Sequence, residues 1–133
     1  MLQLNKCSPY LFALLLFAGC TAAELETAHT LESGDYRIEI LAPGGDFREG
    51  EIPLAIRASR NGEVVELVEG RLDLHMSAMG AMPRMDTGTG FTKSGDQLES
   101  DIFFEMDGAW QGRLEVITAE GKTIREPIRV RVK

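Results

Sequence analysis

Cysteine is missing from most of this chain of 133 residues, because its two copies, Cys7 and Cys20, both fall before position 21. Residues 21–133 therefore contain no disulfide bond, and they offer no thiolate for a structural zinc site or a blue-copper centre. We expect a domain built from these residues to be held together by apolar packing alone.

Basic residues are scarce relative to acidic ones. The chain has 14 Lys and Arg against 21 Asp and Glu, which gives a net charge of −7. Lys6 is the only charged residue before position 21, so residues 21–133 alone carry a net charge of −8. The phosphates of a nucleic acid would repel such a protein, and we expect no nucleic-acid partner.

A hydrophobic run long enough to cross a membrane is absent as well. The apolar run Tyr10–Ala18 falls short of the roughly 20 residues that a membrane-spanning helix needs. A basic residue before it, Lys6, and small residues after it are typical of a secretory signal peptide. The segment Phe17-Ala18-Gly19-Cys20 resembles a bacterial lipobox, which implies cleavage before Cys20 and attachment of lipid to it.

The resemblance to a lipobox predicts a location. Residues 1–19 would be the lipoprotein signal peptide, and the lipid on Cys20 would anchor the protein to a membrane. Thr21, and not Asp, follows the cysteine, which by the sorting rule of enteric bacteria favours the outer membrane over the inner one, on the periplasmic side. We interpret residues 20–34 as the lipidated N-terminus and a polar tether, with His29 as a solvated residue of that tether.

Residues 35–133 carry the pattern of an all-β domain. Short runs of alternating apolar and polar residues recur, turn residues separate them about every ten positions, and no helical periodicity stands out. This predicts an Ig-like antiparallel β-sandwich of about seven strands. The expected strands are Tyr36–Ile40, Ile52–Ile56, Val64–Val68, Leu72–Met76, Leu98–Glu105, Trp110–Thr118 and Ile124–Val132.

Turn and edge residues refine this prediction. Asn61-Gly62 is a strong hairpin signal, because both residues tolerate a positive φ, and Glu69-Gly70 is a second expected turn. Pro53 and Pro127 lack an N–H group. Pro127 therefore indicates an edge strand, and Pro53 indicates either an edge strand or an outward-facing position near the start of its strand. The core is expected to contain Trp110 and either Phe103 or Phe104.

The segment from Ser77 to Gly95 lacks clear periodicity, and we expect a long loop there. Such a loop in a small domain is more often functional than not. It contains Thr87-Gly88-Thr89-Gly90, which no helix follows, and we interpret these residues as flexible spacing rather than a phosphate-binding loop. Residues 21–133 also lack a cysteine nucleophile and a recognisable Ser/His/Asp arrangement, so we do not expect an enzyme.

The most unusual stretch of the chain is His75–Met85, which holds four of the five methionines that follow Met1. Met79, Met82 and Met85 recur at intervals of three, but Gly80 and Pro83 argue against a helix. Thioether sulfur is a soft ligand that, without thiolates, selects Cu(I). A loop would let several sulfurs converge on one ion.

Two interpretations of the methionines stay open at this stage. One is a Cu(I) site formed by His75 with Met79, Met82 and Met85, and the other is gap filling in the core by a flexible side chain. Met76 favours the core, and Met106, which lies at a strand end, fits either role.

His75 and Asp73 should share the outer face of their strand, since Leu72, Leu74 and Met76 alternate with them. Asp73 could then orient the imidazole for a metal. It could equally belong to a solvated polar face.

From Tyr36 onward the chain also resembles the YtkA-like/FixH-like domain. The matching segments are Asn61-Gly62-Glu63-Val64-Val65, the methionine run with Met82-Pro83, and Phe104-Glu105-Met106-Asp107-Gly108-Ala109-Trp110 followed by Leu114-Glu115-Val116. The resemblance implies an extracytoplasmic β-sandwich that is associated with copper handling or cytochrome oxidase assembly. The run resembles, more loosely, periplasmic copper chaperones with paired His and Met ligands. Those chaperones carry a second His-x-Met late in the chain, whereas this chain has no histidine after His75.

Together these features predict a lipid-anchored periplasmic protein that buffers Cu(I) or exchanges it with another envelope protein. Its expected ligands are drawn from His75 and the five methionines, which are Met76, Met79, Met82, Met85 and Met106. The alternative is an envelope module that binds no metal and docks a protein partner through its methionine-rich loop.

Overall fold

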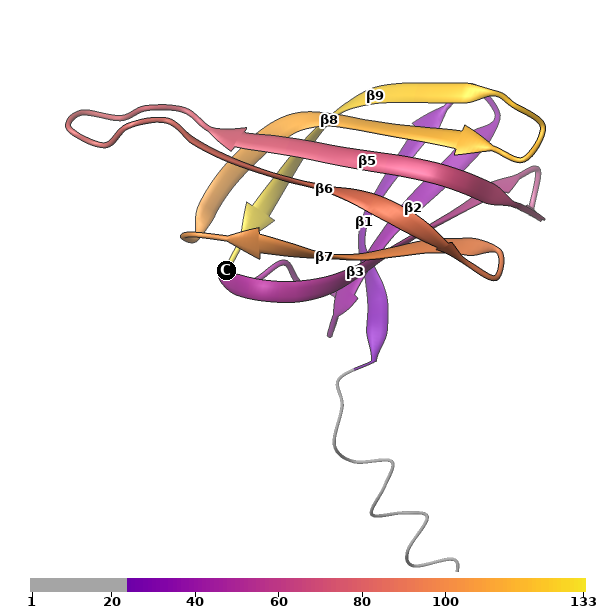
Figure 1. The fold of residues 1–133 in the computed structure, drawn as a ribbon, viewed down its shortest axis with the longest axis horizontal. Helices are drawn as coiled ribbons and strands as arrows, with labels where there is room; N and C mark the ends of the chain where they lie inside the picture. Colours follow the sequence, from indigo (N-terminus) through magenta and orange to yellow (C-terminus); the bar gives the residue numbers. More distant parts are fainter. Residues whose placement is uncertain (1–23) are drawn as a thin grey trace, which may run out of the picture.

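The computed structural model describes residues 24–133, and this part of the chain consists of strands and turns (Figure 1). The predicted signal peptide and Cys20 lie outside the described residues. Within residues 24–133 there is no helix that could span a membrane. The nine strands are β1 (Leu25–Ser33), β2 (Tyr36–Pro43), β3 (Gly50–Arg60), β4 (Glu63–Val65), β5 (Leu67–Met76), β6 (Met85–Ser94), β7 (Gln97–Phe104), β8 (Gly108–Thr118) and β9 (Thr123–Val132).

The strands pair in the order β1-β2-β3-β7-β6-β5-β8-β9, and β4 pairs with β3. Every pairing between named strands is antiparallel. Strand β6 changes partner along its length: residues 85–91 pair with β5, and residues 92–94 pair with β7. The sheet therefore folds over at β6, and its two ends, β1 and β9, come into contact. The predicted all-β antiparallel sandwich is confirmed, as a nearly closed one, but residues 24–133 form nine strands instead of about seven.

One of the additional strands lies in the segment that we expected to be a tether. Strand β1 pairs with β2 from Leu25, opposite Pro43, to Ser33, opposite Tyr36. The prediction of a tether as far as residue 34 is therefore wrong for residues 25–33. This strand is polar, since only Ala28 and Leu31 pack against the core. An edge strand of this composition gives too weak an apolar alternation to be recognised from the sequence. Half-burial in β1 lowers the pKa of His29 by desolvation.

The long loop expected from Ser77 to Gly95 is also corrected. Only residues 77–84 and the turn residue Gly95 lie outside the strands, because β6 runs from Met85 to Ser94 and includes the Thr-Gly repeat. The two threonines face inward, where Thr87 Oγ1 donates to the Phe103 carbonyl at 2.5 Å and the Thr89 hydroxyl lies 2.5 Å from the Ser100 hydroxyl. Threonine hydroxyls thus connect β6 to β7 where the two strands have separated. These small polar residues explain why a hydrophobic pattern was missing.

The core is apolar and centres on aromatic residues at one end of the sandwich. Phe104 and Trp110 are fully buried and meet edge to face, with ring centroids 5.6 Å apart. Phe47 contacts Phe104 in the same way at 6.2 Å. Phe103 is 55% exposed, so Phe104 is the one of the two phenylalanines that belongs to the core.

Most of the turn and edge predictions are confirmed. Asn61 and Gly62 have φ values of 52° and 82°, as a hairpin turn with two positive φ angles requires. Pro127 lies in the edge strand β9, whereas Pro53 is an exposed residue near the start of β3, which is an interior strand. The turn expected at Glu69-Gly70 is wrong, because Gly70 is buried within β5 against Leu98.

Candidate functional site

The methionine run forms the tip of the β5–β6 hairpin, which extends beyond the other strands in Figure 1. Met76 pairs with Met85 at the last rung of the regular ladder. Beyond it the strands bridge once more, where Met79 and Met82 exchange N–H···O bonds of 3.1 and 2.8 Å. Gly80, the first residue of the two-residue turn, has a φ of +57°, as a type II′ turn requires. The interval of three thus places each methionine opposite another one.

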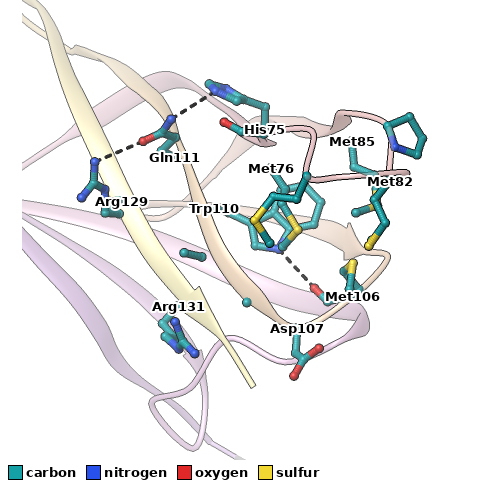
Figure 2. Close-up of a pocket in the computed structure, with 15 residues that line it drawn as sticks. His75, Met76, Met82, Met85, Met106, Asp107, Trp110, Gln111, Arg129 and Arg131 are labelled. Carbon is teal, nitrogen blue, oxygen red and sulfur yellow. Dashed lines mark hydrogen bonds between the residues drawn. The ribbon is translucent and has the colours of Figure 1, made fainter.

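A cavity of about 490 Å³ lies beside this hairpin. This volume falls within the usual range for small-ligand sites. All five methionines after Met1 line it, together with His75, Trp110, Arg129 and Arg131 among others. Figure 2 shows the side chains of Met82 and Met106 pointing toward one another. The structure therefore brings together the five thioethers that the sequence analysis singled out, including Met106 from a distant turn.

The five methionines differ in exposure. Met76 and Met85 pack against the hydrophobic core, and Met106 is half-buried. Met79 is 71% exposed and Met82 is 42% exposed. Met76 therefore contributes to the core as expected, while the tip of the hairpin presents its sulfurs to solvent.

Trp110 and Gly108, at the start of β8, line the cavity and hold two of its methionines in place. The indole N–H of Trp110 donates to the carbonyl of Met106 at 3.1 Å, which fixes the turn before β8. Gly108 has a φ of +123°, and a Cβ placed there would lie 2.9 Å from the terminal methyl of Met76. A larger residue at Gly108 would therefore strain the backbone and displace Met76.

His75 is at the cavity rim, but its ring points away from the labelled methionines and toward Gln111 (Figure 2). The amide nitrogen of Gln111 lies 3.4 Å from Nε2 of His75, and the Gln111 oxygen accepts a bond of 3.2 Å from Arg129. An amide nitrogen only donates, so this contact uses the unprotonated Nε2. Asp86 lies directly opposite His75 on the other strand of the hairpin. No sequence pattern pointed to Gln111 or Arg129, because only strand pairing brings them to this rim.

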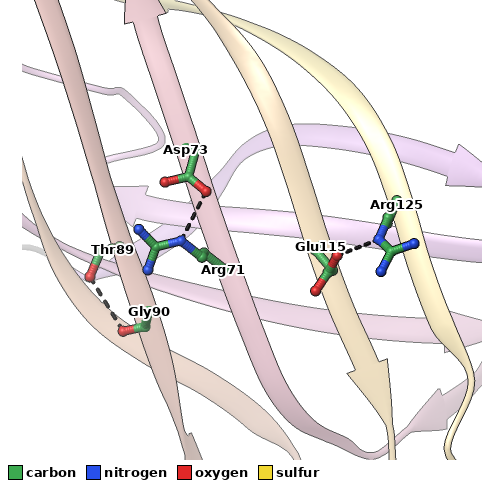
Figure 3. Close-up of polar contacts among 6 residues, drawn as sticks. All are labelled: Arg71, Asp73, Thr89, Gly90, Glu115 and Arg125. Atoms are coloured by element: carbon green, nitrogen blue, oxygen red, sulfur yellow. Dashed lines mark hydrogen bonds and ion pairs between the residues drawn. The ribbon is translucent and has the colours of Figure 1, made fainter.

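Asp73 shares the outer face with His75, as predicted, but it does not contact the imidazole. Its carboxylate accepts a 2.9 Å hydrogen bond from Arg71 Nε on the same strand (Figure 3). Glu115 and Arg125 form a similar ion pair between β8 and β9. Of the two open interpretations of Asp73, the solvated polar face is the one that the structure supports.

Harder metal ligands do not gather anywhere in the described part of the chain. Residues 24–133 contain no group of three or more His, Cys, Asp or Glu side chains that could hold a metal ion. Among the charged residues at the cavity, Asp107 is an acid, and Arg129 and Arg131 are bases. Five thioether sulfurs therefore line the cavity beside a single carboxylate, that of Asp107.

Comparisons with models of protein families, with curated proteins and with solved structures found no match for this chain. The resemblance to the YtkA-like/FixH-like domain therefore stays a prediction.

Proposed function

We propose that this protein binds Cu(I) in the methionine-lined cavity and buffers it or exchanges it with another protein of the cell envelope. One observation carries the proposal: all five methionines after Met1 line a single cavity, although Met106 comes after β7 and the other four belong to the β5–β6 hairpin. We further propose that lipid on Cys20 anchors the protein on the periplasmic side of the outer membrane. A partner in cytochrome oxidase assembly fits the resemblance described above.

The chemistry of the donors favours Cu(I) over other metals. Thioethers are soft, neutral ligands, whereas Ca²⁺ and Mg²⁺ require several oxygen ligands. The cavity has one carboxylate, Asp107, and a lining that is mostly apolar. A monovalent ion held by neutral sulfurs also carries less charge into an apolar site than a divalent ion would.

We assign the ligands to the methionines in preference to His75. The imidazole lies on the outer face of the hairpin with its Nε2 engaged by Gln111. It would have to leave this contact and change its rotamer before it could bind the same ion. His75→Gln is therefore a suitable control variant, because it changes the rim and keeps every sulfur atom.

The test is a titration of the purified full chain with Cu(I), under reductant and in competition with a chromophoric chelator. We expect the wild type to withdraw copper from the chelator, and Ag(I) to shift the methyl NMR signals of all five methionines. Simultaneous Met→Leu replacement of Met82, Met85 and Met106 should abolish the competition, since Leu conserves volume but lacks sulfur. His75→Gln should compete as well as the wild type. Failure of the wild type to compete would refute the proposal.

The docking alternative is favoured by a separate observation. Met79 and Met82 are exposed at the tip of a projecting hairpin, where flexible apolar side chains suit an adaptable protein contact. This alternative predicts that partner binding is insensitive to copper and to the Met→Leu replacements. A copper-dependent change in partner affinity would speak for the metal site.

A further inference from the structure

The methionines of the hairpin form two rungs that differ in depth. Met79 and Met82 make the outer rung beside the turn, and Met76 and Met85 make the inner rung where the regular ladder ends. Opposite residues in an antiparallel pair point to the same side of the hairpin. The two rungs are three positions apart along each strand, which corresponds to about 10 Å in an extended chain.

The two rungs have different surroundings. The inner rung packs against the hydrophobic core, and the Met76 methyl lies against Gly108. The outer rung packs on little, since Met79 is 71% exposed and Met82 is 42% exposed. An ion held by the outer rung would remain accessible to another protein, whereas an ion held at the inner rung would be shielded from water.

Met106 connects the two levels. It lies in the turn before β8, with its carbonyl held by the Trp110 indole, so its position is fixed by the core and not by the hairpin. Its side chain points toward Met82 of the outer rung (Figure 2), and it lines the same cavity as Met85 of the inner rung. Met106 can therefore share an ion with either rung.

We infer that the cavity is a two-stage Cu(I) site, in which the exposed Met79 and Met82 capture the ion and Met76, Met85 and Met106 hold it. This inference rests on the copper-binding function proposed above. Transfer proceeds by exchange of one sulfur ligand for the next, with Met82 and Met106 sharing the ion between the stages. Copper stays in the +1 state throughout, so no oxidant or reductant takes part. The flexible, unbranched methionine side chain suits such stepwise exchange.

The two stages can be separated with two double variants of the full chain. The capture variant is Met79→Leu with Met82→Leu, and the holding variant is Met85→Leu with Met106→Leu. Ala81→Leu is the matched control, since it adds an apolar side chain at the tip and leaves every sulfur in place. Each protein is measured in two ways: equilibrium competition with a chromophoric Cu(I) chelator, and the stopped-flow rate of copper transfer to that chelator. Circular dichroism and thermal unfolding establish that each variant is folded.

We expect the capture variant to lose less affinity than the holding variant and to transfer copper more slowly than the wild type, by about tenfold or more, which corresponds to about 1.4 kcal/mol in the barrier. The holding variant should lose affinity by a similar factor. Met76→Leu, a milder change in the same stage, provides a second measurement if the holding variant is unfolded.

The outcomes distinguish this inference from the proposed function. If the wild type binds copper but both double variants lose affinity equally, or if the capture variant transfers at the wild-type rate, the two-stage division is wrong and the copper site stands. If the wild type does not compete with the chelator, the copper site itself is wrong.

Discussion

Gly112 offers a sharp test of how strands β5 and β8 pack next to the cavity. It lies in β8 opposite Leu74 of β5, next to Gln111, whose side chain reaches His75. A Cβ atom placed on Gly112 would lie 1.9 Å from the carbonyl oxygen of Asp73 and 2.8 Å from its carbonyl carbon. Gly112→Ala therefore pushes one strand against the backbone of the next, and no rotation of a side chain can relieve the contact.

The size of the effect follows from this geometry. Real Cβ contacts essentially never fall below 3.0 Å, so β5 and β8 would have to separate by about 1 Å at this rung. Overpacking usually costs about 1–3 kcal/mol, and a contact with backbone belongs at the upper end, near 3 kcal/mol. Gly90→Ala is the matched control, because a Cβ there meets only Arg71 Nη1 at 3.9 Å. Gly90→Ala should stabilise the fold by about 0.5 kcal/mol, because alanine lowers the conformational entropy of the unfolded chain.

Urea unfolding, followed by the fluorescence of the single tryptophan, measures both variants. With a slope of about 2 kcal/mol per molar, the Gly112→Ala midpoint should fall by about 1.5 M relative to the wild type. The Gly90→Ala midpoint should stay the same or rise slightly. Equal midpoints for the two variants would refute the close approach of β5 and β8 at Gly112.

Three further predictions address the acid dependence, the exposed sulfurs and the aromatic core. The Thr27 hydroxyl, which donates a 2.7 Å hydrogen bond to Glu39, lowers the pKa of that carboxyl. This stabilisation of the fold is present above the pKa that Glu39 has in the unfolded chain, and it is lost as the pH falls through the lower pKa of the folded state. Thr27→Val should therefore lower the free energy of unfolding at neutral pH. In unfolding series at acidic pH, the variant and the wild type should have the same free energy of unfolding. Hydrogen peroxide should oxidise Met79 before Met76, as measured by peptide mass mapping, because Met79 is 71% exposed and Met76 packs on the core. Phe104→Ala should lower the free energy of unfolding in urea by about 3–5 kcal/mol, and a loss below 1 kcal/mol would contradict its place in the core.

The fold class was accessible from the sequence wherever apolar residues alternate with polar ones. Strands β2, β7, β8 and β9 bury one set of alternating side chains, such as Ile38 and Ile40 in β2. Their apolar periodicity is therefore enough to predict them as strands. Strands β1 and β6 do not follow this rule. In β6 the inward positions include Thr87 and Thr89, whose hydroxyls bond across to β7, and the outward ones include glycine. A strand that contacts its neighbour through hydroxyl groups, as β6 contacts β7, does not need alternating apolar residues. A hydrophobic pattern in the sequence therefore cannot reveal it.

The candidate site divides in the same way. The concentration of methionines between positions 76 and 85 was visible in the sequence, and so was the possible membership of Met106. The direction of the His75 ring was not, because it depends on Gln111 and Arg129, which β8 and β9 bring to the rim from far along the chain. Strand alternation correctly placed Asp73 and His75 on one face, but it could not tell that Arg71 would take the carboxylate of Asp73.

The interval of three between methionines matches neither the period of a helix nor that of a strand, and the hairpin explains it. Met76 and Met79 stand at the same distances before the Gly80-Ala81 turn as Met85 and Met82 stand after it. Pairing across the turn therefore places each of these methionines opposite another one, and this pairing is local to the hairpin. Four of the five sulfurs are thus gathered by one local hairpin, and long-range packing has only to add Met106 and the Trp110 support beneath it. The register of this single turn therefore determines whether the cavity has a cluster of sulfur atoms at all, since a slip of one residue would send one side of each methionine pair to the opposite face.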